Sequence, residues 1–135
     1  MVVVRGVNKK KLAKKPERKK LIEELDSEFS KFIRRRDGYK CITCGSTYKP
    51  QCGHYVSRKY MSTRWDARNC NCQCMACNVF LHGNMDEYAI KLKEKYGEKV
   101  LEELNELKHT TVKYTLDELL DLINYYKHQN NGKNI

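Results

Sequence analysis

The sequence has no long apolar run. No stretch approaches the ~18 consecutive apolar residues that a membrane-spanning helix needs, and residues 2–4, all valine, are too few for the core of a signal peptide. We therefore expect no membrane partner and a cytoplasmic location, in the cytoplasm or the nucleoid of a bacterial host. The sequence also contains no internal repeat, which excludes a repeat architecture.

Acidic residues are scarce beside basic ones. The chain of 135 residues has 17 Asp and Glu against 27 Lys and Arg, a net charge of +10. A basic excess of this size favours a polyanionic partner, and nucleic acid fits best because Lys and Arg bind phosphates and release counterions. With 40% hydrophobic and 33% charged residues, a large core is not expected, and a metal could supply the missing stability.

Cysteine is absent outside residues 39–84, which hold all seven. An odd number in C-x-x-C spacing, without an export signal, predicts reduced thiols and a metal site instead of disulfides. Cys41 and Cys44 form one such pair, and Cys74 and Cys77 form the second. Four thiolates suit a structural, tetrahedral Zn²⁺ with no open position.

The other cysteines leave one alternative open. Cys70, Cys72 and Cys74 alternate, so they share one face if the segment is a strand. A register in which Cys72 replaces Cys74 as the zinc ligand therefore remains possible. Otherwise we expect Cys52, Cys70 and Cys72 to be small buried hydrophobic residues.

The chain before the first cysteine divides into two parts. Residues 1–16 carry six basic residues and no acid, which predicts a disordered basic arm. Residues 17–38 predict an amphipathic helix, because their apolar residues recur at spacings of three and four. This helix ends in Arg34, Arg35 and Arg36, which are either DNA-phosphate contacts or a solvated face, and Gly38 is expected to stop it.

The chain after the second cysteine pair reads as a helical tail over residues 86–130, followed by a disordered end at 131–135. A first helix over 86–96 is stopped by Gly97, a second covers 98–108, and a third starts at Thr115 with Glu118 completing a capping box. Their apolar stripes predict packing on the N-terminal helix or a homodimer.

Residues 39–85 should form the central unit, with a β-hairpin between the two cysteine pairs and a strand at 54–56. Residues 57–66 read as a basic loop around Tyr60 and Trp65. Basic residues among aromatic ones suit a surface that follows a nucleic-acid backbone; the basic residues are Arg58, Lys59 and Arg64. For Trp65 itself, a position in the core is favoured over base stacking.

Catalytic chemistry is possible in this central unit. The imidazole of His54 can accept a proton from water near neutral pH. Phosphodiester hydrolysis also needs a divalent cation, and Mg²⁺ prefers oxygen ligands, including amide oxygens. Asn78 directly follows a zinc ligand and could offer one.

The stretch from Cys41 to Asn84 resembles the HNH, or His-Me finger (ββα-metal), nucleases that carry a zinc knuckle. The resemblance lies in C-x-x-C, a His on the first strand, an Asn, and C-x-x-C followed by His or Asn. More closely, G-H-Y, R-W-D-A-R-N and Q-C-M-A-C-N resemble the phage NinG (Rap) recombination proteins. This closer resemblance covers roughly residues 38–100.

The resemblance implies an α+β fold, a zinc-stapled ββα-metal finger flanked by an N-terminal helix and a C-terminal helical segment. It implies that His54 is the general base and that Asn69 braces the loop that orients it. It also implies that Asn78 binds a catalytic Mg²⁺ or Mn²⁺, with His82 as a second ligand or a phosphate contact. The implied function is a metal-dependent endonuclease for branched recombination intermediates of the Holliday-junction or D-loop type.

The sequence departs from the family at Gly53. Many His-Me finger nucleases carry Asp or His before the base, where it binds the catalytic metal. Here Asp66 or His82 would have to supply that ligand, or phosphate and water would fill in. Two alternatives therefore stay open: a non-catalytic zinc-finger module that binds nucleic acid, and a zinc-held scaffold protein.

Overall fold

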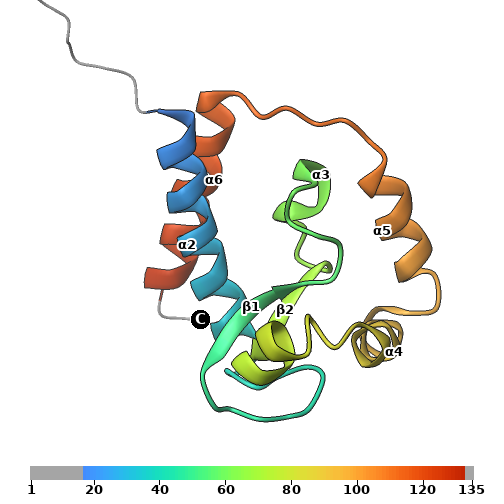
Figure 1. Ribbon diagram of the computed structural model, residues 1–135. Helices are drawn as coiled ribbons and strands as arrows, with labels where there is room; N and C mark the ends of the chain where they lie inside the picture. Colours follow the sequence, from blue (N-terminus) through green and yellow to red (C-terminus); the bar gives the residue numbers. More distant parts are fainter. Residues whose placement is uncertain (1–16, 133–135) are drawn as a thin grey trace, which may run out of the picture.

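A small antiparallel sheet lies between two pairs of helices (Figure 1). This computed structural model describes residues 17–132. Strand β1, Pro50–His54, pairs with strand β2, Cys70–Cys74, and His54 stands opposite Cys70. The predicted basic arm at residues 1–16 and residues 133–135 of the predicted disordered end lie outside the described residues. The mixture of helices and a two-stranded sheet confirms the α+β class.

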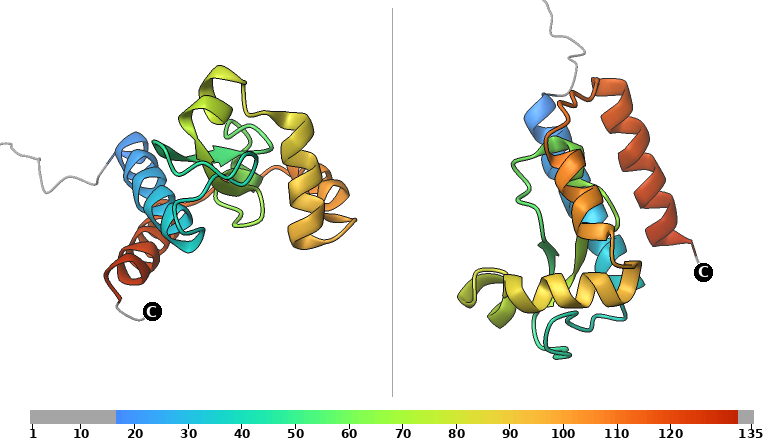
Figure 2. Two further views of the ribbon diagram at one scale, coloured as in Figure 1. Left: turned by 90° about the horizontal axis from the view of Figure 1, so that it is seen from below. Right: turned by 90° about the vertical axis from the view of Figure 1, so that its right-hand side faces the viewer.

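Helices α2, Arg18–Arg36, and α6, Leu116–Asn131, lie side by side and run in the same direction (Figures 1 and 2). Arg18 at the start of α2 donates to the carbonyl of Tyr114, just before α6. Arg35 near the end of α2 donates to the carbonyl of Gln129 at 3.0 Å, near the end of α6. One core fills the space between the helices: Leu21, Leu25, Phe29, Ile33, Trp65, Cys70, Leu119, Ile123 and Tyr126.

The predicted helix ends are confirmed. Gly38 has a φ of +64°, the left-handed conformation that ends a helix, and Gly97 has a φ of +103° after the first helix of the tail. At the start of α6, the Glu118 N–H donates to the Thr115 hydroxyl at 3.0 Å, and the Thr115 N–H donates to the Glu118 carboxylate at 2.8 Å. These bonds are the predicted capping box.

Helices α4, Met85–Tyr96, and α5, Val100–Lys108, cover the opposite face of the hairpin, and both start within two residues of their predicted positions. The buried Tyr88 of α4 donates its hydroxyl to the carbonyl of Gly53 at 2.7 Å. A second core lies here, made of Val56, Tyr88, Leu92, Val100 and Leu104. The sheet therefore separates two small cores instead of covering one large core.

The predicted strand at 54–56 is wrong in its bounds, because β1 ends at His54. Beyond that residue, the Val56 N–H donates to the Asn69 side chain at 2.7 Å and not to a partner strand. The Tyr55 N–H still donates to the Asn69 carbonyl at 2.9 Å, so the backbone pairing stops where the Asn69 side chain binds the Val56 N–H.

The expected basic loop contains a short helix, α3, Met61–Arg64. Trp65 follows it and is only 8% exposed, and its indole N–H donates to Asp26 of α2 at 3.0 Å. The prediction that Trp65 belongs to the core is therefore confirmed. Among the helices that the structure describes, none is long and apolar enough to cross a membrane.

Candidate functional site

Four cysteines that could hold a metal ion lie together at one end of the hairpin, and this group is here called the four-cysteine centre. The loop after α2 supplies Cys41 and Cys44, β2 supplies Cys74, and the π-helical turn η1, Ala76–Phe80, supplies Cys77. Their sulfurs all lie within 4.8 Å of one another, and those of Cys44 and Cys74 are 3.6 Å apart. A tetrahedral ion with Zn–S bonds of about 2.3 Å needs sulfurs about 3.8 Å apart, so these residues fit a structural Zn²⁺.

Hydrogen bonds around Cys41 favour its thiolate form, whereas contacts with the other three sulfurs raise the pKa of Cys44 to about 12. The Thr43 hydroxyl accepts from the Gln73 amide at 3.2 Å, so its own proton is free for the Cys41 sulfur at 3.1 Å. Burial alone would raise the pKa of Cys41, but the bonds from Thr43 and from backbone N–H groups lower this pKa to about 6. This lowered pKa favours the thiolate form that a zinc ligand needs.

The remaining cysteines stand apart from the four-cysteine centre. Cys72 is fully buried and belongs to no ligand group, and burial raises its pKa to about 11. The alternative in which Cys72 replaces Cys74 is therefore wrong, because Cys74 points its sulfur at Cys44. Cys70 is also fully buried, as expected, whereas Cys52 is half-buried.

The six predicted DNA contacts differ in what they already bind. Arg36 donates to Asp37 and to the carbonyls of Ala67 and Cys70. Arg64 makes a two-pronged ion pair with Asp26, with its shorter N–O distance at 2.5 Å. These two arginines tie the fold together, and a phosphate would have to compete with those internal bonds.

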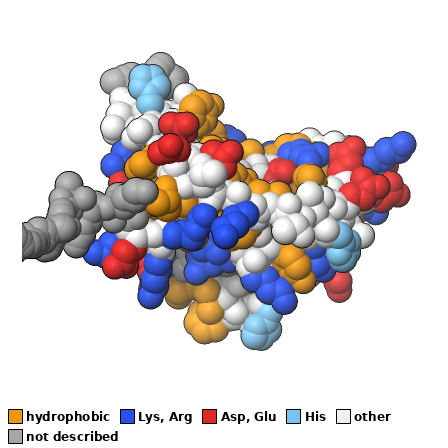
Figure 3. All heavy atoms as spheres, turned by 90° about the horizontal axis from the view of Figure 1, so that it is seen from above, with side chains coloured by type: hydrophobic (Ala, Val, Ile, Leu, Met, Phe, Trp, Pro, Cys, Tyr) orange, Lys and Arg blue, Asp and Glu red, His pale blue; other side chains and the backbone are white. Residues whose placement is uncertain are grey.

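Of the other four residues in that set, Arg34, Arg58 and Lys59 are more available, whereas Arg35 already donates to the carbonyls of Gln129 and Asn130. Arg34 donates to Ser30 within its own helix, and Arg35 holds the end of α6. The side chain of Arg58 is 62% exposed, and Lys59 is exposed beside it. Lys and Arg side chains gather near the middle of the face seen in Figure 3, with hydrophobic side chains beside them.

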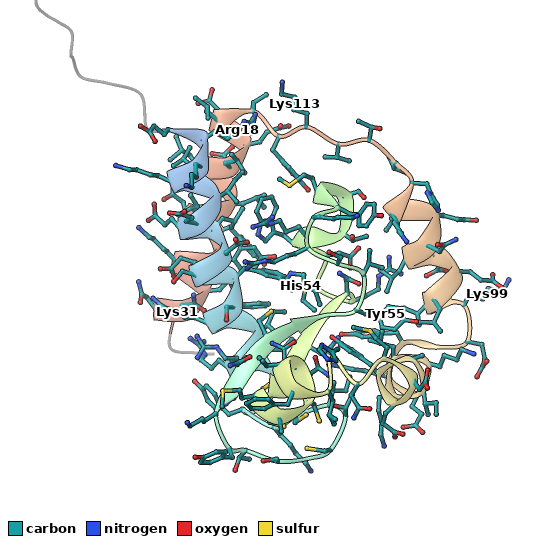
Figure 4. All side chains as sticks on the ribbon, in the orientation of Figure 1. Arg18, Lys31, His54, Tyr55, Lys99 and Lys113 are labelled. Carbon is teal, nitrogen blue, oxygen red and sulfur yellow. The ribbon has the colours of Figure 1, made fainter. Side chains whose placement is uncertain are left out.

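His54 lies at the end of β1 and is directed toward α2, whereas Tyr55 lies on the opposite side toward α4 and α5 (Figure 4). Its Nε2 lies 2.8 Å from the carbonyl oxygen of Arg64. A carbonyl only accepts, so Nε2 carries the proton and Nδ1 keeps the lone pair. Burial lowers the pKa of His54 below its ordinary value of 6.5, and the imidazole is therefore neutral at pH 7.

Asn69 closes the loop that follows His54. Its side-chain oxygen accepts from the Val56 N–H at 2.7 Å, and its amide donates to the carbonyls of Val56 at 3.0 Å and Thr63 at 3.1 Å. The side chain is fully buried. These bonds give Asn69 the bracing geometry that the resemblance implies, whereas its effect on His54 in catalysis stays a prediction.

Asp26 is a supporting residue that sequence reasoning missed. It fixes Arg64 through the ion pair and Trp65 through the indole bond, and the Arg64 carbonyl in turn holds His54. Asp26 lies 28 positions before His54 in the sequence. Nothing local to α2 indicates this role, since one Asp on an amphipathic helix normally faces water.

The structure does not bring Asn78 or His82 to His54. The Asn78 amide donates to the Gln51 side chain at 2.8 Å. Side chains alternate along a strand, so Gln51 lies on the face of β1 opposite His54. His82 is exposed in the turn before α4. Asn78 therefore contacts the face of the hairpin opposite His54, which separates the predicted base from this predicted metal ligand.

The position of Gly53 cannot hold a metal-binding side chain as the chain is packed. A Cβ added there would lie 2.0 Å from the Gln73 side-chain oxygen, which is buried and has no hydrogen-bond partner. Asp66, the other expected source of a ligand, accepts from the Arg68 N–H at 2.8 Å. Within residues 17–132, both clusters of three or more metal-binding side chains contain cysteines. These residues do not fit the oxygen ligands that Mg²⁺ or Mn²⁺ requires.

Known proteins resemble nearly the whole chain. A family model described as the bacteriophage lambda NinG protein matches residues 4–133. Protein ninG of Escherichia phage 933W is 34% identical over 113 residues, which cover 81% of this chain and 55% of the relative. Protein ninG of phage lambda is 33% identical, with 81% and 54% covered, and that of Salmonella phage P22 is 34% identical, with 81% and 55% covered.

The chain spans about half the length of the curated relatives it matches. No solved structure matches it.

Proposed function

Because the chain belongs to the bacteriophage NinG family, we propose that it is a DNA endonuclease of the HNH, or His-Me finger, type. Its substrates would be branched recombination intermediates such as Holliday junctions and D-loops. The observation that carries the proposal is His54, a neutral imidazole held at the end of β1 by the Arg64 carbonyl, beside a loop that Asn69 closes.

His54 would act as the general base. With Nε2 donating to the Arg64 carbonyl, Nδ1 holds the lone pair that takes a proton from the attacking water. A pKa below 6.5 keeps that lone pair free at pH 7. Asn69 would keep the loop after His54 in one conformation, which holds the ring in place relative to the bound phosphate.

The charge of the chain supports DNA as the partner. A net charge of +10 over 135 residues favours binding to phosphates, with an affinity that falls steeply as salt rises. We propose Arg58 and Lys59 as backbone contacts, since both are exposed on the loop that follows His54. Paired cuts across a junction need two active sites, so the proposal includes a homodimer.

A second candidate function is DNA binding without cleavage. The packing of Gln73 against Gly53 and the separation of Asn78 from His54 favour it, because the residues do not fit a catalytic Mg²⁺ or Mn²⁺. In this case the four-cysteine centre and the basic surface would serve recognition alone. The two functions predict the same DNA affinity and differ in whether the chain cuts.

The deciding experiment compares cleavage of a labelled four-way junction with that of a matched linear duplex. Wild type and His54→Ala are incubated with each DNA and with Mg²⁺ or Mn²⁺. We expect cuts in the junction, and a rate about 10²- to 10⁴-fold lower in His54→Ala, the usual loss when a general base is removed. DNA binding should be unchanged in the variant.

His109→Ala is the matched control, since His109 is exposed at the end of α5 and should cut like wild type. Equal cutting of junction and duplex would keep the nuclease and remove the branch preference. A wild type that binds the junction and never cuts with either ion would overturn the nuclease and leave the binding module.

A further inference from the structure

A second group of side chains that could bind a metal lies on one face of the hairpin, away from the four-cysteine centre. Cys52, His54 and Cys70 each place one ligand atom within 4.8 Å of the other two. His54 and Cys70 are directly opposite each other in the ladder, and Cys52 is two residues before His54. Side chains two residues apart on a strand share a face, so the register of the sheet creates this Cys52–His54–Cys70 group.

We propose that the Cys52–His54–Cys70 group is a second zinc site. Two thiolates and an imidazole are the ligands that select zinc among the common divalent ions, whereas Mg²⁺ prefers oxygen. Three protein ligands leave a fourth position for water, in contrast to the closed four-cysteine centre. The two sulfur ligands and the nitrogen ligand also explain why this part of the chain does not suit a catalytic Mg²⁺, which prefers oxygen.

The surroundings of His54 suit a metal ligand. Its Nε2–H donates to the Arg64 carbonyl at 2.8 Å, and metal-binding histidines commonly donate their other ring N–H to a backbone carbonyl. Asp26 holds Arg64 through an ion pair, so the carbonyl is itself fixed. The ring therefore has one defined orientation, with its lone pair on Nδ1.

Charge also favours zinc at this buried position. Zn²⁺ with two thiolates and a neutral imidazole has no net charge, so the site adds no uncompensated charge to the core. Cys70 belongs to that core, together with Phe29 and Trp65. The four-cysteine centre would carry two negative charges instead, and three lysines lie beside it: Lys40, Lys91 and Lys95.

Zinc at this second site would use the lone pair of His54. Resting on the proposed function, this predicts that the chain cuts DNA only when the second site is empty. Zinc would then inhibit cleavage at concentrations that fill the Cys52–His54–Cys70 group, while the four-cysteine centre stays loaded throughout.

The test is the zinc content of the folded full chain after equilibration with Zn²⁺ and removal of the unbound ion. Wild type should hold two zinc ions per chain, and Cys52→Ser with Cys70→Ala should hold one. Cys72→Ala is the matched control, since Cys72 is buried on the same strand but outside both groups, and it should hold two.

Because Cys70 is fully buried, Cys52→Ser alone provides a milder variant at a half-buried position. Removing a hydrogen-bond partner of a metal ligand usually weakens metal binding by roughly 10- to 100-fold. Cys52→Ser removes a ligand itself, so it should weaken zinc binding at the second site by more than this. When Co²⁺ replaces zinc, the thiolate ligands should give a charge-transfer absorption. This absorption should be lower in Cys52→Ser than in wild type by the contribution of one site.

One zinc per wild-type chain would overturn the second site, as would two zinc ions in the double variant. Activity is measured separately, so the two proposals can fail independently. A chain that binds two zinc ions and never cuts DNA loses the nuclease but keeps the site. A chain that cuts DNA and binds one zinc loses the site but keeps the nuclease.

Discussion

Asn69 shows how much one buried amide can hold together. Three hydrogen bonds join its side chain to the backbone of Val56 and Thr63. Its backbone N–H donates to the carbonyl of Asp66 at 2.9 Å, and its carbonyl accepts from the Tyr55 N–H at 2.9 Å. At this scale, stability depends on buried polar groups that have partners, because an unpaired buried group costs about 1–3 kcal/mol.

We predict that Asn69→Ala lowers the free energy of unfolding by about 3 kcal/mol, since it leaves the N–H and the carbonyl of Val56 without partners, whereas the Thr63 carbonyl keeps its bond from the Asp66 N–H. Urea unfolding with zinc held constant measures the change. The control is Asn105→Ala at an exposed position of α5, which should stay within about 0.5 kcal/mol of wild type. A loss below about 1 kcal/mol for Asn69→Ala would contradict the bracing role.

At the scale of elements, the carboxylate of Asp37 holds the end of α2 against β2. Asp37 is the residue that ends α2, and its carboxylate accepts from the Cys72 N–H at 2.8 Å and from Arg36 at 2.7 Å. Lys95 of α4 also approaches Asp37, at 3.4 Å. One carboxylate thus joins two helices and a strand next to the four-cysteine centre.

This joint should weaken in acid. Burial raises the pKa of Asp37, but the bonds from Arg36 and Cys72 and the charges of Arg36 and Lys95 lower it below its ordinary 3.8. Because its pKa is lower in the folded state, the Asp37 carboxylate stabilises the fold at pH values above its unfolded-state pKa of about 3.9. This stabilisation is lost as the pH falls through the folded-state pKa.

We predict that Asp37→Asn lowers the free energy of unfolding at pH 7 by about 1–3 kcal/mol, and that its difference from wild type shrinks below about pH 4. Urea unfolding of both proteins at a series of pH values measures this difference. Zinc-ligand protonation affects both proteins alike, so the difference isolates Asp37. A difference that stays constant down to pH 3 would show that the charge is not responsible.

At the scale of the whole molecule, a structural metal at the four-cysteine centre could supply stability that the two small cores lack. The sheet has two strands of five residues each, and a two-stranded hairpin is marginal in water without further support. The four-cysteine centre ties the loop after α2 to β2 and η1. The parallel pair of α2 and α6 encloses one core, and α4 and α5 enclose the other.

We predict that removing zinc with a strong chelator lowers the melting temperature by about 15 °C or more, because structural zinc contributes folding free energy directly. Thermal unfolding followed by circular dichroism measures it, alongside the zinc content. Added Zn²⁺ should restore the melting temperature, whereas added Mg²⁺ should not. An unchanged melting temperature in chain proven free of zinc would contradict a structural role.

Several features of this protein could be predicted from the sequence because their signals are local. The stops at Gly38 and Gly97 and the capping box at Thr115 each depend on residues within a few positions of the helix end. The four-cysteine centre could also be predicted, because each C-x-x-C pair is a local unit and the two pairs together suit one tetrahedral ion.

Other features were decided only by the tertiary structure, because they join residues far apart in the chain. The register of β1 against β2 places Cys70 opposite His54 and creates the Cys52–His54–Cys70 group. The same alternation separates His54 from Asn78, and Asp26 reaches the site only because α2 packs on the loop. Sequence spacing carries no information on such contacts, since the fold alone sets which side of the hairpin each side chain faces.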